Sequence, residues 1–476
     1  MKCSLPDKEL SEPTGSNSSW TELLRKYSVS RKPCGLNFRF FMRRAVSNGR
    51  ADSYTHFIHS YPGKILRHIP SFLLNIANLC PEEGVVLDPF CGSGTVLLES
   101  LLSRKQKSGT FGVEINPLGR LVSKVKTTLI EVEVLDQKLG DYLGFINDKA
   151  TKASIPEYSK MGFWFSKPAI EKLGVTRHQL ECLPADDVSD LIWLSFSSIV
   201  RKVSLADPYV PPPIKLKPSK FPQDSARFYK AKELLQRNQD PPVLEMLNKE
   251  VAKNVEKLKT LQGAPKANSR PEIIWKDARE IRIGRMGYKG RFQEGNAKLL
   301  DGKSIDLIIT SPPYLSAQKY IRSQKLQLIW LGLLTESEVR VMEREIIGSE
   351  HTSAKELSTI AETGSRKADD LIEWAKRKSP EVACRTYKYF HNMTKAMHEF
   401  HRVLKDGGHL VMILGNNRLL GRPIRTYRYL IDLADQYSMK PKIVLRDKIR
   451  GRGMFTTRND SGGLITDEYV VVLEKV

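Results

Sequence analysis

A short apolar run that ends in a glycine-rich turn constrains the fold more than any other feature of the sequence. Residues 84–90 read GVVLDPF and residues 91–95 read CGSGT. A helical pattern (TVLLESLLSR, 95–104) follows, and then a second apolar run (TFGVEI, 110–115). A strand, a glycine turn, a helix and a further strand are typical of an open parallel sheet with helices on both faces. We therefore predict a doubly wound α/β fold.

The alternation of strands and helices is interrupted twice along the chain. It stops near residue 130, returns at PEIIWKDA (271–278) and SIDLIITSPPY (304–314), and stops again before HEFHRVLKDGGHLVMILGNN (398–417). Both intervening stretches have mostly helical patterns. The division that follows is an irregular N-terminal arm (1–55), three parts of one α/β core (56–130, 271–334 and 396–476), and two helical insertions (131–270 and 335–395). Within the first part of the core, we expect an amphipathic helix to begin near Pro62. The runs 441–449 and 468–476 predict a closing antiparallel pair.

The charge of the chain favours a polyanionic partner. Lys and Arg number 76 against 54 Asp and Glu, which gives a net charge of +22. Residues 201–300 carry half of this excess, with 22 basic and 11 acidic side chains. Clustered Lys and Arg gain affinity for a phosphate backbone because they release its condensed counterions. A basic surface without a partner is the alternative, and charge alone does not exclude it.

Other compositional signals exclude several classes of protein. The longest apolar stretches, such as LIWLGLL (328–334), are far shorter than the roughly 20 residues of a membrane span. No secretory signal is visible at the start, so we expect a cytoplasmic protein. The six cysteines form no CxxC pair, and His56, His59 and His68 have no acidic or Cys partner at ligand spacing. We expect no metal site, and we interpret Cys91 as a small buried residue.

The glycine turn is suited to hold a ligand. Gly92 and Gly94 let the backbone approach a bound molecule, and the helix that begins at Thr95 offers unpaired N–H groups. The next two strands end in Glu114, positioned to accept ribose hydroxyls, and in Asp277, which can accept a hydrogen bond from an adenine amino group. No Lys follows the turn as in a phosphate-binding P-loop, and no third glycine completes a dinucleotide motif. A tight turn without a ligand is the alternative.

A second motif, Ser311-Pro312-Pro313-Tyr314, follows the buried run 305–310. Two prolines cannot extend the ladder of a strand, and they fix the backbone direction. The Ser311 oxygen and a proline carbonyl can then accept both hydrogens of an amino group on a planar base, while Tyr314 stacks on the ring. The alternative is an ordinary proline turn.

These groups are suited to methyl transfer. Two acceptors aimed at an aromatic amine stabilise the positive charge that develops when it attacks the methyl group of a sulfonium. Proximity supplies much of the acceleration, and no metal is required. A base inside a duplex cannot be reached in this way, so it must be flipped out.

DPFCGSGT followed by TSPPY resembles the amino-directed, S-adenosylmethionine-dependent DNA methyltransferases. In that family FxGxG binds the cofactor and [DNS]PP[YFW] holds the target amine. HSYPGK (59–64) is similar to an additional cofactor-binding segment of some members. The resemblance implies a Rossmann-like methyltransferase sheet with helical insertions, and cofactor contacts at Tyr61, Asp88, Phe90, Gly92, Ser93, Gly94, Thr95, Glu114 and Asp277.

The first residue of the tetrapeptide bears on the target base. Ser at this position is commoner in family members that methylate cytosine at N4, whereas Asp or Asn is commoner in those that methylate adenine at N6. The resemblance thus implies a site-specific cytosine-N4 methyltransferase acting on double-stranded DNA, with a restriction endonuclease as a possible partner in a bacterial or archaeal cell. The alternatives are an adenine-N6 enzyme, an RNA or tRNA base methyltransferase, and a non-catalytic DNA-binding protein on a methyltransferase scaffold.

The first insertion is the candidate target-recognition region because of its size and charge. It lies between the strands that end in Glu114 and Asp277, which is not where the family's usual layouts place such a region. Its aromatics Phe163, Trp164 and Phe165 are expected in a local core. The expected nucleic-acid contacts are Lys215, Lys217 and Lys220 in a proline-rich stretch, Arg322 and Lys325 after the SPPY strand, and Arg450 and Arg452 in the loop 450–463. Solvated linker or surface charge is the alternative for these side chains.

Overall fold

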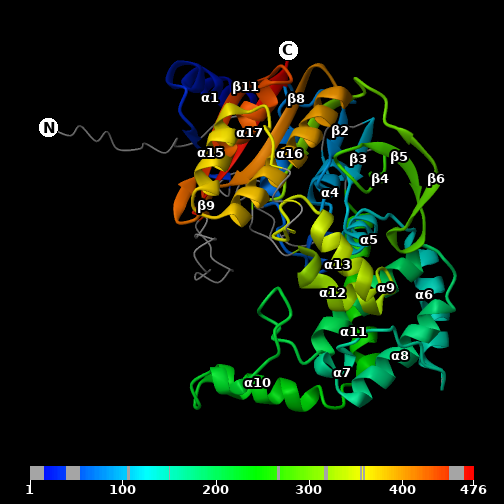
Figure 1. Ribbon diagram of the computed structural model, residues 1–476. Coiled ribbons are helices and arrows are strands. Elements are labelled where there is room, and N and C mark those ends of the chain that lie inside the picture. Colours follow the sequence, from blue (N-terminus) through cyan, green and yellow to red (C-terminus); the bar gives the residue numbers. More distant parts are fainter. Residues whose placement is uncertain are drawn as a thin grey trace.

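An eight-stranded sheet lies at the centre of the protein (Figure 1). The structure is a computed structural model that describes residues 16–38, 54–103, 108–148, 151–264, 269–315, 320–353, 356, 360–449 and 466–476. The strand order is β1-β11-β12-β8-β7-β2-β3-β4. These strands are β1 (Cys34–Gly35), β2 (Val85–Asp88), β3 (Gly109–Val113), β4 (Glu272–Trp275), β7 (Ile305–Thr310), β8 (Leu404–Gly415), β11 (Met439–Lys448) and β12 (Asp467–Lys475).

The direction of the strands confirms the predicted doubly wound fold. β4, β3, β2, β7 and β8 run parallel. β12 runs antiparallel to both β8 and β11, so β11 and β12 form the antiparallel pair that the two C-terminal runs predict. Starting from β2, the chain adds β3 and β4 on one side and later β7 and β8 on the other. Open α/β sheets bind ligands at the carboxyl ends of the strands where the order reverses. That point here lies between β2 and β7.

Helices cover both faces of the sheet, and α15 to α17 lie over one face in Figure 1. The central residues of the parallel strands are mostly apolar because both faces of the sheet are buried there. The helices of the core are α1 (Ser16–Ser30), α3 (His68–Leu74), α4 (Thr95–Leu101), α5 (Pro117–Lys126), α12 (Tyr320–Trp330), α13 (Glu336–Glu345), α15 (Arg366–Lys376), α16 (Pro380–Val403) and α17 (Thr426–Asp435). Asn116 caps α5, and its Oδ1 accepts from the backbone of Leu118 at 3.0 Å.

Two expectations about the N-terminal part of the chain are wrong. Residues 16–38 are not an irregular arm: α1 buries Trp20 and Leu23 in the main core, and β1 pairs with β11. The helix expected near Pro62 begins only at His68. Gly63 has a positive φ of 69°, which breaks a helical path there. The segment 61–65 is thereby free to line the ligand cleft described below.

Between β3 and β4 the chain forms a helical bundle, at the lower right in Figure 1. Its apolar core includes Trp164 and Phe165, as expected, and continues onto α5 and α12. Phe163 is 48% exposed, so its expected burial is wrong. The helix α10 extends away from the other helices at the bottom of Figure 1. The bundle consists of α6 (Val132–Asn147), α7 (Met161–Trp164), α8 (Lys167–Glu181), α9 (Asp187–Val203), α10 (Ala226–Arg237) and α11 (Val243–Gln262).

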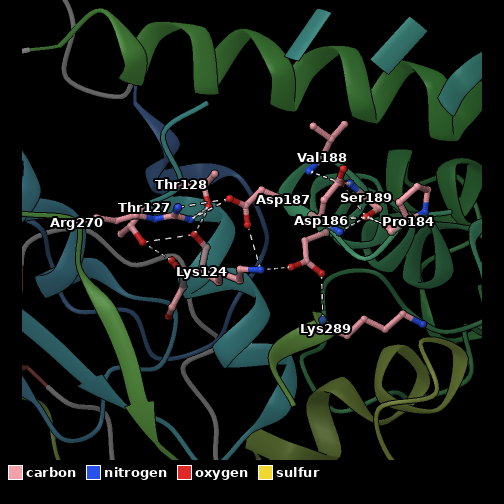
Figure 2. Close-up of polar contacts among 12 residues, drawn as sticks. Lys124, Thr127, Thr128, Pro184, Asp186, Asp187, Val188, Ser189, Arg270 and Lys289 are labelled. Carbon is pink, nitrogen blue, oxygen red and sulfur yellow. Dashed lines mark hydrogen bonds and ion pairs between the residues drawn. The ribbon is translucent and has the colours of Figure 1, made fainter. Parts of the chain in front are cut away.

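Ion pairs at a partly buried lysine join this bundle to α5, a helix that packs on the sheet (Figure 2). Nζ of Lys124 on α5 lies 2.6 Å from Asp190 Oδ2 and 3.1 Å from Asp187 Oδ1, both on α9. Asp190 is fully buried, and its Oδ1 accepts from the backbone N–H of Lys289 at 3.1 Å. Removing one partner of such a pair leaves a buried charge uncompensated. The pair therefore fixes how α9 sits on α5.

Among the described residues, no helix combines the length and the apolar character that a membrane crossing requires.

The described part of the chain also contains short elements that the sequence pattern does not predict. The remaining elements are the hairpins β5 (Arg282–Met286) with β6 (Phe292–Leu299) and β9 (Asn417–Leu419) with β10 (Arg422–Ile424), and the 3-10 turns η1 (Thr55–Phe57), η2 (Pro218–Lys220) and η3 (Tyr288–Gly290).

Candidate active site

A cleft opens at the carboxyl ends of β2, β3, β4 and β7. Its walls bring together the glycine turn and the SPPY motif, because Gly92 and Ser311 both line it. This is the arrangement that the two motifs predict. The lining comes from residues 61–65, 89–93, 113–116 and 276–279, together with Thr95, Ser311, Pro313, Tyr320, Ile321, Ile346 and Ile347.

The glycine turn is shaped by its two glycines. Gly92 and Gly94 have φ values of 53° and 71°, a region that side chains with a Cβ rarely adopt. A Cβ at Gly94 would lie 2.8 Å from Ser123 Oγ and 3.1 Å from Ser123 Cα. Ser123 Oγ in turn donates to the carbonyl oxygen of Gly92 at 3.0 Å. Gly94 does not line the cleft, and it acts by letting the turn pack on α5.

Asp88 lies beneath the turn and does not line the cleft. Its Oδ1 accepts hydrogen bonds from Thr310 Oγ1 at 2.7 Å and from the backbone N–H of Phe90 at 3.1 Å. Its Oδ2 has no hydrogen-bond partner in the part of the chain that the structure describes. Burial raises the pKa of Asp88 to about 7. Asp88 thus holds the base of the turn to β7.

Glu114, at the end of β3, faces the cleft from the neighbouring strand. Its Oε2 accepts from the backbone N–H of Gly92 at 2.7 Å and its Oε1 from that of Asn116 at 2.8 Å. Burial raises the pKa of Glu114, and these two hydrogen bonds oppose that rise. The Tyr61 side chain is a further hydrogen-bond partner of this carboxylate. A carboxylate has about four acceptor positions, so Glu114 keeps at least one of them for a ligand in the cleft.

Asn116 links this wall of the cleft to the SPPY side. Its Nδ2 donates to Tyr61 Oη at 3.3 Å and to Gln324 Oε1 at 2.6 Å. Gln324 lies on α12, the helix that follows the SPPY segment in the chain. Neither Asn116 nor Gln324 is among the site residues that the sequence predicts. The sequence signal for Asn116 is its position as the N-cap of α5.

Asp277, after β4, lines the cleft with Arg279 beside it. Arg279 Nε lies 3.0 Å from Asp277 Oδ1, and its Nη2 lies 2.7 Å from Oδ2. The carboxylate is therefore held in a fixed orientation by a two-pronged ion pair. Arg279 also donates to Asn392 Oδ1 at 3.0 Å, which anchors the pair to α16.

The SPPY segment presents its first and third residues to the cleft, Ser311 and Pro313. Ser311 Oγ donates to the carbonyl oxygen of Ile413 on β8 at 3.0 Å. The hydroxyl oxygen has two acceptor positions, and its hydrogen bond with the Tyr314 side chain leaves one of them for a ligand. Pro312 and Tyr314 do not line the cleft, and the Tyr314 phenol has the Ser311 side chain and the Gly415 backbone as hydrogen-bond partners. Stacking of Tyr314 on a base stays a prediction.

Buried basic residues next to the turn have structural partners. His59 Nε2 lies 3.0 Å from Ser197 Oγ, and His56 Nε2 lies 2.7 Å from Glu99 Oε1. Lys64, in the cleft wall, donates to the backbone carbonyls of both histidines. Among the described residues, no three His, Cys, Asp or Glu side chains gather as a metal-ligand set.

The expected nucleic-acid contacts lie in different surroundings. Lys217 and Lys220 are exposed, whereas Lys215 Nζ lies 4.6 Å from the centroid of the Phe163 ring. Arg322 is exposed at a small hollow next to the cleft, and Lys325 is half-buried 5.1 Å from the Trp164 ring. Arg450 and Arg452 lie outside the described residues.

The sheet, its switch point and the cleft have the arrangement of a Rossmann-like methyltransferase fold, and residues 53–134 match a family described as UPF0020, an RMKL-like methyltransferase domain. The chain is 21% identical over 444 residues to the Type II methyltransferase M.MvaI of Kocuria varians. The matched stretch covers 90% of this chain and 91% of that protein. Over 119 residues, the chain is 24% identical to the Type II methyltransferase M.MjaII of Methanocaldococcus jannaschii, covering 24% of this chain and 21% of that protein. These findings support a DNA methyltransferase family for this chain, as its motifs predict.

Proposed function

We propose that the protein transfers a methyl group from S-adenosylmethionine to an exocyclic amino group of a base in double-stranded DNA, at a specific sequence, and that the target is N4 of cytosine. The observation that carries this proposal is the shared cleft, in which the glycine turn at Gly92 and the hydroxyl of Ser311 face one space. Similarity to a Type II methyltransferase along 90% of the chain supports sequence-specific action on DNA.

The residues of the cleft fit the cofactor. The carboxylate of Glu114 matches the hydroxyls of a ribose, and Asp277, one strand further out, matches the amino group of adenine. Phe90 and Ile115 supply apolar surface for the nucleoside. S-adenosylmethionine, when bound, supplies an electrophilic methyl group on a sulfonium.

Ser311 and the adjacent proline segment orient the amine. Because the Ser311 hydroxyl donates to Ile413, its oxygen can accept one amino hydrogen, and a proline carbonyl can accept the other. The two acceptors stabilise the positive charge that develops on the nitrogen during attack. The base reaches this position only outside the stacked duplex, so we propose that it is flipped into the cleft.

The remaining basic residues are proposed to hold the DNA. Lys217 and Lys220 are exposed on the basic first insertion, which we propose as the target-recognition region, with Lys215 beside them. Arg322 lies next to the cleft, where phosphates that flank a flipped base would pass, and Lys325 follows it on α12. Arg450 and Arg452 keep the same proposed role, and a cognate restriction endonuclease is the proposed partner.

Transfer of tritiated methyl groups from S-adenosylmethionine to duplex DNA and to tRNA tests this function. We expect label in DNA, loss of nearly all turnover in Ser311→Ala, and unchanged cofactor affinity in that variant. Ser304→Ala is the matched control, because Ser304 immediately precedes β7, at the end of the strand remote from the cleft, and its hydroxyl donates to the nearby carbonyl of Asp301. Label in tRNA alone would refute the proposal.

A further inference from the structure

A fully buried lysine lies directly behind the glycine turn. Lys126 is the last residue of α5, and its side chain has no exposed surface. Its Nζ donates to Ser93 Oγ at 3.2 Å. Ser93 belongs to the turn and lines the cleft. A cation is therefore one hydrogen bond away from the space that the cleft encloses.

The charged groups around Lys126 do not explain why the lysine is there. The carboxylate of Glu99 attracts the Lys126 side chain, but its Oε1 lies 2.7 Å from His56 Nε2. Lys64, which is part of the cleft wall, repels the charged form of Lys126. Burial lowers the pKa of Lys126 well below its ordinary value, because an ammonium loses its hydration there. An apolar side chain of equal length would pack at lower cost, so a stability role alone does not account for the lysine.

The hydrogen bond fixes what Ser93 can do. Lys126 Nζ is the donor, so the Ser93 oxygen accepts and its hydroxyl hydrogen points elsewhere. A hydroxyl donor polarised by a cation binds a carboxylate well. Glu114 and Asp277 assign the nucleoside to the β3 and β4 side of the cleft. The amino-acid end of the cofactor then falls at the turn after β2, next to Ser93.

We propose that Lys126 is a positioning residue for the carboxylate of S-adenosylmethionine, acting through the hydroxyl of Ser93. This inference rests on the proposed function. It adds that affinity for the cofactor depends on a buried lysine that does not itself line the cleft, and that this dependence is confined to ligands that have the carboxylate.

Calorimetric titration with two ligands tests the inference. S-adenosylhomocysteine keeps the carboxylate, and decarboxylated S-adenosylmethionine lacks it. We expect Lys126→Met to weaken binding of S-adenosylhomocysteine about 10- to 100-fold, the range of one hydrogen bond to a charged group. Binding of the decarboxylated ligand should change less than about twofold, and the thermal midpoint of the ligand-free protein should stay equal or rise. Lys249→Met, on an exposed lysine of α11, is the control for loss of charge.

Each outcome decides one question. Equal weakening of both ligands, or no weakening of either, would overturn the inference. If Lys126→Met does not fold, Ser93→Ala carries the same comparison, and it too should weaken only the ligand with the carboxylate. A wild-type protein that binds neither ligand would instead overturn the proposed function, so the two failures are distinguishable.

Discussion

Thr310 Oγ1 donates a hydrogen bond of 2.7 Å to Asp88 Oδ1, and both side chains are fully buried. These are the last residues of β2 and β7, the two strands between which the order of the sheet reverses. The glycine turn follows the first strand and the SPPY motif follows the second. One buried hydrogen bond therefore sets the two halves of the cleft relative to each other.

Thr310→Val tests this link. The variant leaves Asp88 Oδ1 with one donor fewer, so we expect a loss of about 1–3 kcal/mol in unfolding free energy. We also expect turnover to fall at least tenfold, because the glycine turn after β2 and the SPPY segment after β7 are then no longer held in a fixed relative position. Thr386→Val is the matched control, since Thr386 is equally buried and donates to the carbonyl of Val382 on α16. Similar turnover in both variants would count against the link.

The pKa of Asp88 gives a pH dependence of stability with a defined sign. Burial raises this pKa from 3.8 to about 7, so the folded protein holds a proton that the unfolded chain releases. The contribution of Asp88 to stability therefore falls as the pH rises from about 4 to about 7, and it is constant above that range. Asp88→Asn keeps the acceptor for Thr310 and removes the titration.

Denaturant unfolding of the wild type and Asp88→Asn at pH 5 and pH 8 measures the effect. We expect the variant to gain in relative stability between the two pH values. A difference that does not change with pH would show that Asp88 does not titrate in this window.

Gly94→Ala, compared with a control glycine, separates the cost of the positive φ at Gly94 from the steric clash of an added Cβ with Ser123. A residue with a Cβ at φ 71° costs about 1–2 kcal/mol, and here the Cβ also meets Ser123 at 2.8 Å. Gly407→Ala is the control, because Gly407 has φ 73° and open space around it. Both variants should lose stability in thermal unfolding, but only Gly94→Ala should lose cofactor binding in titrations. Retained binding in Gly94→Ala would mean that the packing of the turn on α5 is not required.

Substitution of Lys217 and Lys220 by Ala tests the proposed DNA surface. Each phosphate contact that is lost lowers the slope of log affinity against log salt by about 0.9. We expect weaker binding to specific and unrelated duplexes alike, with cofactor affinity unchanged. Lys303→Ala, at an exposed ion pair with Asp406, is the control. A salt slope that stays at the wild-type value would exclude these two lysines as phosphate contacts.

The sequence predicted those parts of the fold that depend on local pattern. The central strands are buried apolar runs, and the turn after Asp88 and the prolines after Ser311 are local motifs, so their place at one edge of the sheet follows from parallel topology. β1 was missed because it has two residues and its partner, Leu445 opposite Cys34, lies at the far end of the chain.

The parts of the site that were missed depend on tertiary contacts. Arg279 lies two residues after Asp277 in the sequence, but only the folded structure shows that it forms an ion pair with Asp277. Lys126 reads as one more basic residue at the end of a helix, and nothing local reveals that it is buried behind Ser93. Tyr314 is named by its motif, but the motif alone does not indicate that its phenol is hydrogen-bonded to neighbouring residues and lies outside the cleft lining.

Mass spectrometry of nucleosides from duplex DNA that has been treated with the protein and S-adenosylmethionine tests the central claim most directly. The account predicts N4-methylcytosine, formed at one recurring sequence and absent from DNA treated with Ser311→Ala. Methylation at a ring carbon, or no modified nucleoside in DNA while the wild type binds the cofactor, would contradict it.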